Sequence, residues 1–203
     1  MTQIKRRMLV VVLVVAVAAP GCSLFDEGLS SSCSTARQEF NDYLRLQGRA
    51  NNAFTEADSH WTDLYNAAGE LDENAIGLGV AALNTDLARA TRRADGADAA
   101  LTGFQQARRD CVVADLPEGC RAEFRQYQQI IDHNEQVLAA QGRLTAAVTA
   151  QRDATVAQNI DAANAATDQH NAAIDDIDAL VDRYNSSVLP AYNRALDRCD
   201  EAT

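Results

Sequence analysis

The chain has 203 residues and is strongly acidic, with 18 basic side chains against 29 acidic ones and a formal net charge of −11. Binding to nucleic acid needs a basic face that displaces counterions from the phosphates, so this composition argues against a nucleic-acid partner. Alanine is abundant, and only three prolines and ten glycines interrupt the chain, which favours an all-helical fold.

The first 21 residues are organised as a secretory signal peptide. Three basic residues, Lys5, Arg6 and Arg7, precede an unbroken apolar stretch from Met8 to Ala19. A helix that crosses a bilayer needs about 20 residues, so this shorter stretch predicts a cleaved signal and not a transmembrane anchor. Removal of residues 1–21 takes away three basic side chains and no acidic one, which leaves 15 basic and 29 acidic side chains and a net charge of −14.

The cleavage site can be read in two ways. Residues 16–18 read Ala-Val-Ala and suit ordinary secretory cleavage, whereas residues 19–22 read Ala-Pro-Gly-Cys and resemble the lipobox of bacterial lipoproteins. The resemblance implies that Cys22 is lipidated and becomes the first residue of an extracytoplasmic protein held at the membrane by its lipid. Without lipidation the protein would be secreted. Residues 22–33 are then the lipidated cysteine and a flexible tether.

The cysteine count agrees with the lipobox. The chain has five cysteines, and use of Cys22 as the lipid carrier leaves an even set, Cys33, Cys111, Cys120 and Cys199. An even set suits disulfide bonds in an oxidising compartment.

Residues 34–203 are predicted to form one all-α domain, an antiparallel up-down-up-down four-helix bundle. Apolar residues recur at alternating spacings of three and four, as in coiled-coil-like helices. These seams run from Ala36 to Ala68, from Ile76 to Cys111, from Phe124 to Val148 and from Ile160 to Ala195. Helices of about 35 residues at about 1.5 Å per residue would each be about 50 Å long.

Three breaks separate the predicted helices. Residues 69–74 read GELDEN, and residues 115–118 have the capping-box spacing with Pro117 in the first helical turn. The third break is placed at residues 152–159 because equal helix lengths require a turn there. Pro190 lies inside the fourth helix and is expected to kink it near its last turns.

All four remaining cysteines fall at one end of such a bundle, and the tether places that end nearest the membrane. Two pairings avoid crossed bridges: Cys111–Cys120 with Cys33–Cys199, or Cys33–Cys111 with Cys120–Cys199. We expect the first pairing, because the nearby pair closes its loop easily and a bridge between the termini constrains nearly the whole unfolded chain.

The opposite end of the bundle would point away from the membrane. Loops carried on a rigid scaffold are where recognition usually resides, so we expect an envelope protein to bind there. The predicted partner-binding residues are those of the first turn: Gly69, Glu70, Leu71, Asp72, Glu73 and Asn74. The turn at residues 152–159 would lie beside them.

The sequence contains no motif for catalysis or for a metal or cofactor, and we predict that the protein is not an enzyme. A di-iron site needs a glutamate three residues before a histidine, and none of His60, His133 and His170 has one. We interpret His60 as solvated and His170 as a hydrogen-bonded boundary residue. Trp61 and Tyr65, one turn apart, are interpreted as core aromatics.

The favoured function is therefore a lipid-anchored interaction or scaffold module of the cell envelope. The alternatives are a ligand-binding sensor or carrier with a cavity between the helices, and an exclusion or inhibitory lipoprotein of the prophage type. Small residues at facing positions let helices approach and close such a cavity, which favours the first function. These residues are Ala50, Ala57, Ala90, Ala94, Ala97, Ala147 and Ala163.

Overall fold

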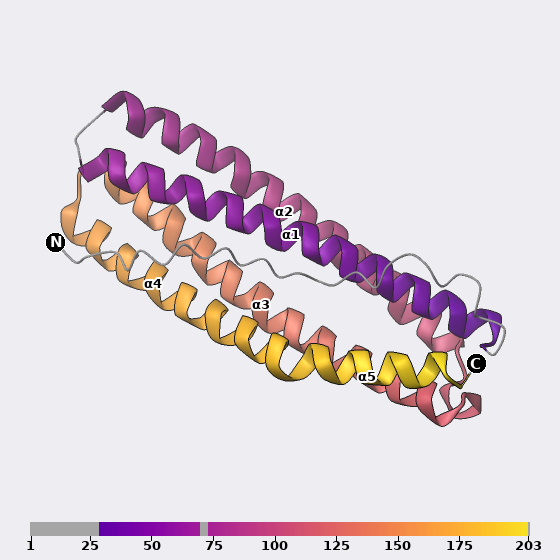
Figure 1. Cartoon of the computed structure of the whole chain (residues 1–203). Helices are drawn as coiled ribbons and strands as arrows, with labels where there is room; N and C mark the ends of the chain where they lie inside the picture. Colours follow the sequence, from indigo (N-terminus) through magenta and orange to yellow (C-terminus); the bar gives the residue numbers. More distant parts are fainter. Residues whose placement is uncertain (1–28, 70–72, 203) are drawn as a thin grey trace. The chain divides into compact units, whose positions relative to one another are not determined.

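The computed structural model describes residues 29–69 and 73–202 (Figure 1). The predicted signal peptide, Cys22 and most of the tether lie outside the described residues, as do residues 70–72 and the side chains at 67–69 and 73. The predictions made for those parts of the chain stay predictions.

Four long helical stretches and no strand make up the described residues, which confirms the predicted all-α bundle. The first three are α1 (Ser31–Gly69), α2 (Glu73–Asp110) and α3 (Glu118–Val156), and the fourth consists of α4 (Ile160–Arg183), the π-helical segment η3 (Tyr184–Val188) and α5 (Leu189–Asp200). A short 3-10 turn, η2 (Val113–Asp115), lies between α2 and α3.

The breaks lie close to the predicted positions. Only three residues separate α1 from α2, and three separate α3 from α4. The third break, which no glycine or proline marks, lies at residues 157–159, at the end of the expected range 152–159. Helix α3 begins at Glu118, two residues later than a capping box at Asp115 predicts. The cause is local, because Asp115 belongs to η2 and Leu116 is extended, with φ −76° and ψ 152°.

Just before Pro190, where the sequence predicts a kink, the fourth helical stretch has a widened helical turn. Proline has no N–H to donate to the carbonyl of Ser186, four residues before it. The N–H of Leu189 donates instead to the carbonyl of Tyr184, five residues back, and η3 is π-helical.

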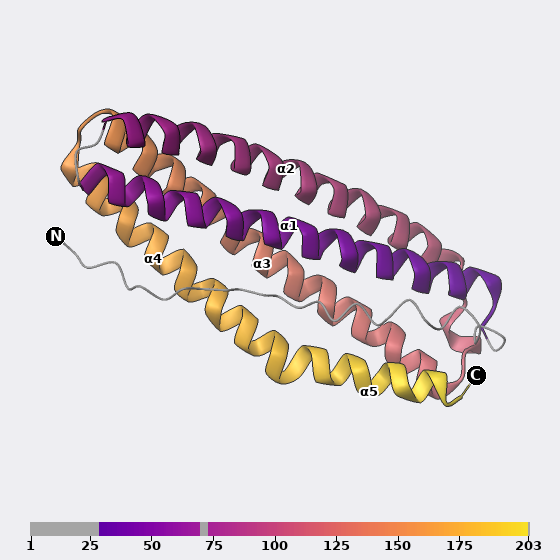
Figure 2. The same cartoon turned by 45° about the horizontal axis from the view of Figure 1, so that its top comes forward.

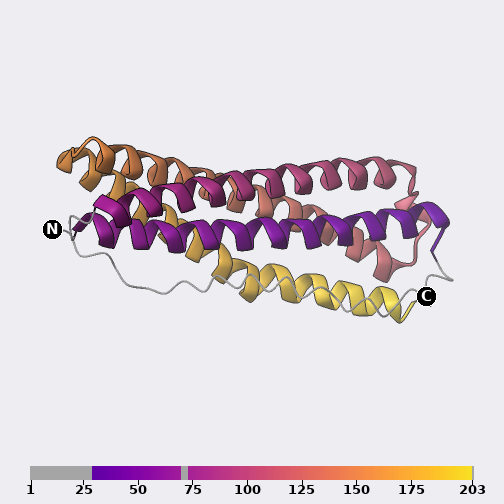
Figure 3. The same ribbon diagram turned by 90° about the horizontal axis from the view of Figure 1, so that it is seen from above.

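The helices contribute to two compact units. Among the described residues, the aromatic unit contains residues 29–50, 93–135 and 181–202, and the polar unit contains residues 51–92 and 136–180 apart from the undescribed turn. Within each unit, segments of all four helical stretches run side by side in alternating directions (Figure 2 and Figure 3). Each unit is thus an antiparallel four-helix bundle by itself.

The core of the aromatic unit is a cluster of large rings. Phe40 stacks on Tyr127 with 4.0 Å between the ring centroids, and Phe104 meets the edge of Tyr127 at 5.6 Å. Phe124 and Tyr192 extend the cluster, and all five rings are buried. Ring pairs of this kind add about 0.5–1.5 kcal/mol to the stabilisation from area burial alone.

Two disulfides lie at the end of the aromatic unit, as predicted, but the expected pairing is wrong. Cys33 is bonded to Cys111 and Cys120 to Cys199, with Cα–Cα distances of 4.6 and 4.2 Å. Each bridge therefore closes the open end of one helical hairpin. The first hairpin consists of α1 and α2, and the second hairpin consists of α3, α4, η3 and α5.

The glycine before Cys120 explains this pairing. An ideal Cβ on Gly119 would lie 2.2 Å from the carbonyl oxygen of Arg198. Only a glycine allows the start of α3 to lie this close to the end of α5, and this approach places Cys120 beside Cys199. Loop entropy in the unfolded chain, on which the expected pairing rested, does not decide which sulfur atoms meet in the folded one.

Candidate functional site

The large apolar side chains that stay exposed in the described chain gather mainly at one end of the polar unit. Leu78 and Ile160 are each 75% exposed and Val156 is 65% exposed, while the fourth, Val112, lies next to η2 in the aromatic unit. Leu78 is in the second turn of α2, Val156 ends α3 and Ile160 begins α4. All three thus lie at the end of the unit where α2 begins and where α3 is followed by α4. We call Leu78, Val156 and Ile160 the apolar tip.

The turn between α3 and α4 is a Schellman motif. The N–H of Asn159 donates to the carbonyl of Ala154 at 2.9 Å, and the N–H of Gln158 donates to that of Thr155 at 3.1 Å. Gln158 has φ 53°, which makes it the one non-glycine residue with a positive φ in the described ranges. Glycine is the usual residue at this position, so the glutamine is held in the left-handed region at some cost.

The start of α4 is capped by the same turn. The side-chain Oδ1 of Asn159 accepts a hydrogen bond from the N–H of Ala162 at 3.0 Å, as an N-cap residue does. With both helix ends satisfied, the backbone holds Val156 and Ile160 four residues apart on a defined turn. Their exposure is therefore not the result of an unformed loop.

Helix α2 directs Leu78 outward. A Cβ at Gly79 would lie 3.3 Å from the Cβ of buried Leu64 on α1, so the face of α2 at Gly79 packs directly against α1. Successive residues of an α-helix are about 100° apart around its axis, which turns Leu78 away from that contact.

The tip agrees only in part with the sequence predictions. Of the predicted partner-binding residues, Glu70, Leu71 and Asp72 lie outside the described residues, Gly69 ends α1, Glu73 begins α2, and Asn74 is exposed. Ile160 was expected on the buried seam of the fourth helix, and this is wrong. It is the first residue of α4 and lies beyond the last turn of α3, so no helical turn of its hairpin partner covers it.

Polar side chains fill much of the interior behind the tip. His170 is buried, its Nε2 lies 2.7 Å from Oδ1 of Asp58, and its ring stacks on Trp61 at 3.6 Å between centroids. His170 is thus hydrogen-bonded, as predicted, but it is buried and not a boundary residue; Trp61 is a core residue, as expected, whereas Tyr65 is only half-buried. The His60 side chain is 44% exposed and its Nδ1 contacts the buried carboxylate of Asp86.

Two further polar pairs join helices within this unit. The Nε2 of Gln141 donates to Oδ1 of Asn51 at 3.0 Å, and the hydroxyl of Thr167 donates to Oε1 of Gln151 at 3.2 Å. Buried polar pairs of this kind fix the register of helices at some expense of stability. Five of the seven alanines expected at facing positions are buried, whereas Ala94 and Ala163 are only half-buried.

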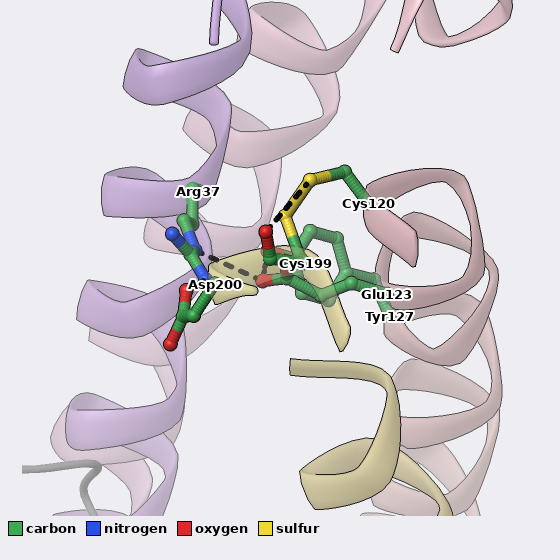
Figure 4. Close-up of a disulfide and its surroundings, with 6 residues drawn as sticks. All are labelled: Arg37, Cys120, Glu123, Tyr127, Cys199 and Asp200. Atoms are coloured by element: carbon green, nitrogen blue, oxygen red, sulfur yellow. Dashed lines mark hydrogen bonds and ion pairs between the residues drawn. A yellow bond between two sulfur atoms is a disulfide. The ribbon is translucent and has the colours of Figure 1, made fainter. Parts of the chain in front are cut away.

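The aromatic unit carries a buried ion pair next to its second disulfide (Figure 4). Arg37 on α1 donates from Nε to Glu123 on α3 at 3.0 Å and from Nη2 to Asp200 at 2.7 Å. The Tyr127 hydroxyl also contacts the Glu123 carboxylate. Burial raises the pKa of Glu123 although the charge of Arg37 opposes the shift, and burial raises the pKa of Tyr127. Arg37 therefore ties the first hairpin to the second.

No group of three or more histidine, cysteine, aspartate or glutamate side chains within residues 29–69 and 73–202 is placed to hold a metal ion. In the same ranges, none of the helices combines the length and apolarity required to cross a bilayer. No protein-family model, curated protein or solved structure matches the chain.

Proposed function

We propose that the protein is a lipid-anchored, extracytoplasmic helical bundle that binds another envelope protein through its apolar tip. The observation that carries this proposal is the gathering of Leu78, Val156 and Ile160 on well-formed helix ends of one unit. Exposed apolar patches on folded proteins commonly mark interaction sites. Full burial of each such side chain is worth about 1.5–3 kcal/mol, which is enough for three of them to decide an interaction.

The disulfides support the extracytoplasmic and lipid-anchored parts of the proposal. Both bridges are buried and together use Cys33, Cys111, Cys120 and Cys199. Disulfides persist in oxidising compartments, and their formation leaves Cys22 as the one cysteine that can carry a lipid. The exclusion or inhibitory role is a special case, in which binding at the tip blocks the envelope protein.

A ligand carrier is the second candidate, and one feature of the polar unit favours it. The indole Nε1 of Trp61 and the Nδ1 of His170 are buried and have no hydrogen-bond partner among the described residues. A small molecule with one acceptor and one donor would satisfy both. Trp61 is the single tryptophan of the chain, so its fluorescence would report such a ligand directly. Unchanged emission in the presence of deproteinised envelope extract would count against the carrier.

The tip can be tested by photo-crosslinking in intact cells. A photoreactive residue is placed at position 78, 156 or 160, and at the exposed position 112 as a matched control. We expect one and the same protein to be crosslinked from all three tip positions and not from position 112, and to bind again when purified. Capture of the same set of proteins from position 112, or of none from the tip, would overturn the proposal.

A further inference from the structure

The second hairpin repeats the first with a shift of 87 positions along most of its length. Helices α1 and α3 both have 39 residues, and their starts, their ends and the starts of α2 and α4 are all 87 positions apart. Cys120 follows Cys33 by the same 87 positions, and buried Leu116 follows buried Leu29 likewise. The two hairpins thus share helix lengths, the position of the turn and the position of the first cysteine.

The buried positions follow the same shift. Helix α1 has twelve buried residues from Cys33 to Leu64, and eleven of their counterparts 87 positions later are buried in α3. The exception is Leu138, the counterpart of Asn51, which is half-buried. The four buried residues of α2 before Phe104 all have buried counterparts at this shift, which are His170, Ala173, Ile177 and Tyr184. Each buried position of the first hairpin except Asn51 thus has a buried counterpart in the second hairpin, which also buries further residues such as Phe124 and His133.

One residue is added in the second hairpin, and the π-helical segment accounts for it. Ala97 and Tyr184 are 87 positions apart, but Phe104 and Tyr192 are 88 apart. The bridged cysteines agree, with sequence separations of 78 and 79. The added residue thus falls where η3 lies. A turn with i to i+5 hydrogen bonds takes up one extra residue without rotating the rest of the helix, so the inner face is preserved.

The aromatic layer shows the repeat most clearly. Each bridged cysteine is seven residues from a buried ring, and the four rings are Phe40, Phe104, Tyr127 and Tyr192. The rings of one hairpin lie 5.1 Å apart between centroids and those of the other 6.2 Å apart, and the stacked Phe40–Tyr127 pair joins the two hairpins. Each hairpin thus presents the same layers to its neighbour.

We propose that two copies of the chain form a dimer by exchanging hairpins. The inner face of the first hairpin of each copy then packs against the inner face of the second hairpin of the other copy. Both disulfides lie within hairpins, so neither opposes the exchange. The contacts between hairpins in the aromatic unit are non-covalent, and they include Arg37 with Glu123 and Tyr43 with Asn134 at 3.0 Å. A partner copy offers the same contacts, which is why exchange of identical elements is a low-cost route to a dimer. This inference does not rest on the apolar tip.

Charge reversal across the hairpin interface tests the exchange. Beside Asp200, the Arg37→Glu chain has acidic groups at both positions 37 and 123, and the Glu123→Arg chain has basic groups at both. When the two chains exchange hairpins, positions 37 and 123 hold one acidic and one basic group at each interface. After oxidative co-refolding, native mass spectrometry should find the mixed dimer at least about tenfold more abundant than either homodimer, as an advantage of one ion pair predicts.

A matched control uses an ion pair that lies within a single hairpin. Arg143 and Asp176 are 2.7 Å apart and both belong to the second hairpin. Chains with Arg143→Glu and with Asp176→Arg cannot complement each other by exchanging hairpins, so their mixture should show no excess of mixed dimer. A mixture of the first two variants that stays monomeric or unfolded, or an equal excess in the control, would overturn the proposal.

The length of the connector gives a second test that changes no interface. Deletion of residues 112–114, which are exposed or half-buried, shortens the connector between α2 and α3 from seven residues to four, and a short hinge favours exchange over folding back within one chain. We expect this variant to be dimeric by light scattering and as helical as the native chain. Insertion of three Gly/Ser residues at the same place should shift the protein toward monomer. A folded monomer, or an unfolded chain, after the deletion would contradict the exchange.

Discussion

Replacement of Gly119 by alanine should destabilise the protein although it adds a good helix former near the start of α3. The new Cβ would lie 2.2 Å from the carbonyl oxygen and 2.7 Å from the carbonyl carbon of Arg198, both of which are backbone atoms. A carbon–oxygen contact needs about 3 Å or more, so α3 and α5 must move apart by close to 1 Å. Overpacking of this kind costs about 1–3 kcal/mol, and the rigid backbone places the cost at the upper end.

The gain in helix propensity offsets about 1 kcal/mol of this cost, which leaves a net loss of about 2 kcal/mol. For a chain of this size the loss corresponds to a fall in Tm of about 4–8 °C, measured by circular dichroism with the disulfides intact. Gly142, in the same helix, is the matched control, because nothing lies within 4 Å of its ideal Cβ. Gly142→Ala should raise the Tm. If Gly119→Ala is as stable as Gly142→Ala, α3 does not lie as close to α5 as the distance between Gly119 and Arg198 indicates.

Three other predictions concern a buried histidine, the distal turn and the anchor. Desolvation and the nearby charge of Arg183 lower the pKa of His133, so the stability of the folded state should fall as the pH drops below 6.5, where the unfolded histidine gains its proton. His133→Gln should flatten the dependence of Tm on pH between 7 and 5, and an unchanged slope would assign the effect to other groups. Gln158→Gly should stabilise the chain by up to about 1 kcal/mol in urea unfolding, and a loss of stability would contradict the left-handed turn. Mass spectrometry of the mature protein should find an acylated N-terminal Cys22. A mature chain that begins before Cys22 and carries no lipid would contradict the anchor and make the protein a secreted bundle.

Periodicity predicted the fold well because a bundle of long helices repeats one simple pattern. The seam that contains Phe40, Trp61 and Leu64 is buried as expected, and the break without glycine or proline lies at residues 157–159. The disulfide pairing could not be derived in this way. It depends on the approach of two backbones at Gly119, which no local pattern shows.

The repeat was nevertheless readable in the sequence. Cys33 precedes Phe40 by seven residues, Cys120 precedes Tyr127 by seven, and the same spacing recurs in reverse before the other two cysteines. This spacing marks where each hairpin begins and ends, but it is the same for all four cysteines and does not select between the two pairings. The apolar tip was harder to predict, because the exposure of Leu78 and Ile160 depends on where the neighbouring helices end.

The most direct test of the proposed function is the affinity of the captured envelope protein for purified variants. Replacement of Leu78, Val156 and Ile160 together by serine should weaken binding by about 100-fold or more, since loss of about 1 kcal/mol or slightly more per side chain sums to about 3 kcal/mol. Val112→Ser, at the other large exposed apolar position of the described chain, should leave the Kd unchanged. Equal Kd values for the native chain and the triple variant, with helicity preserved in both, would show that the apolar tip is not the binding surface.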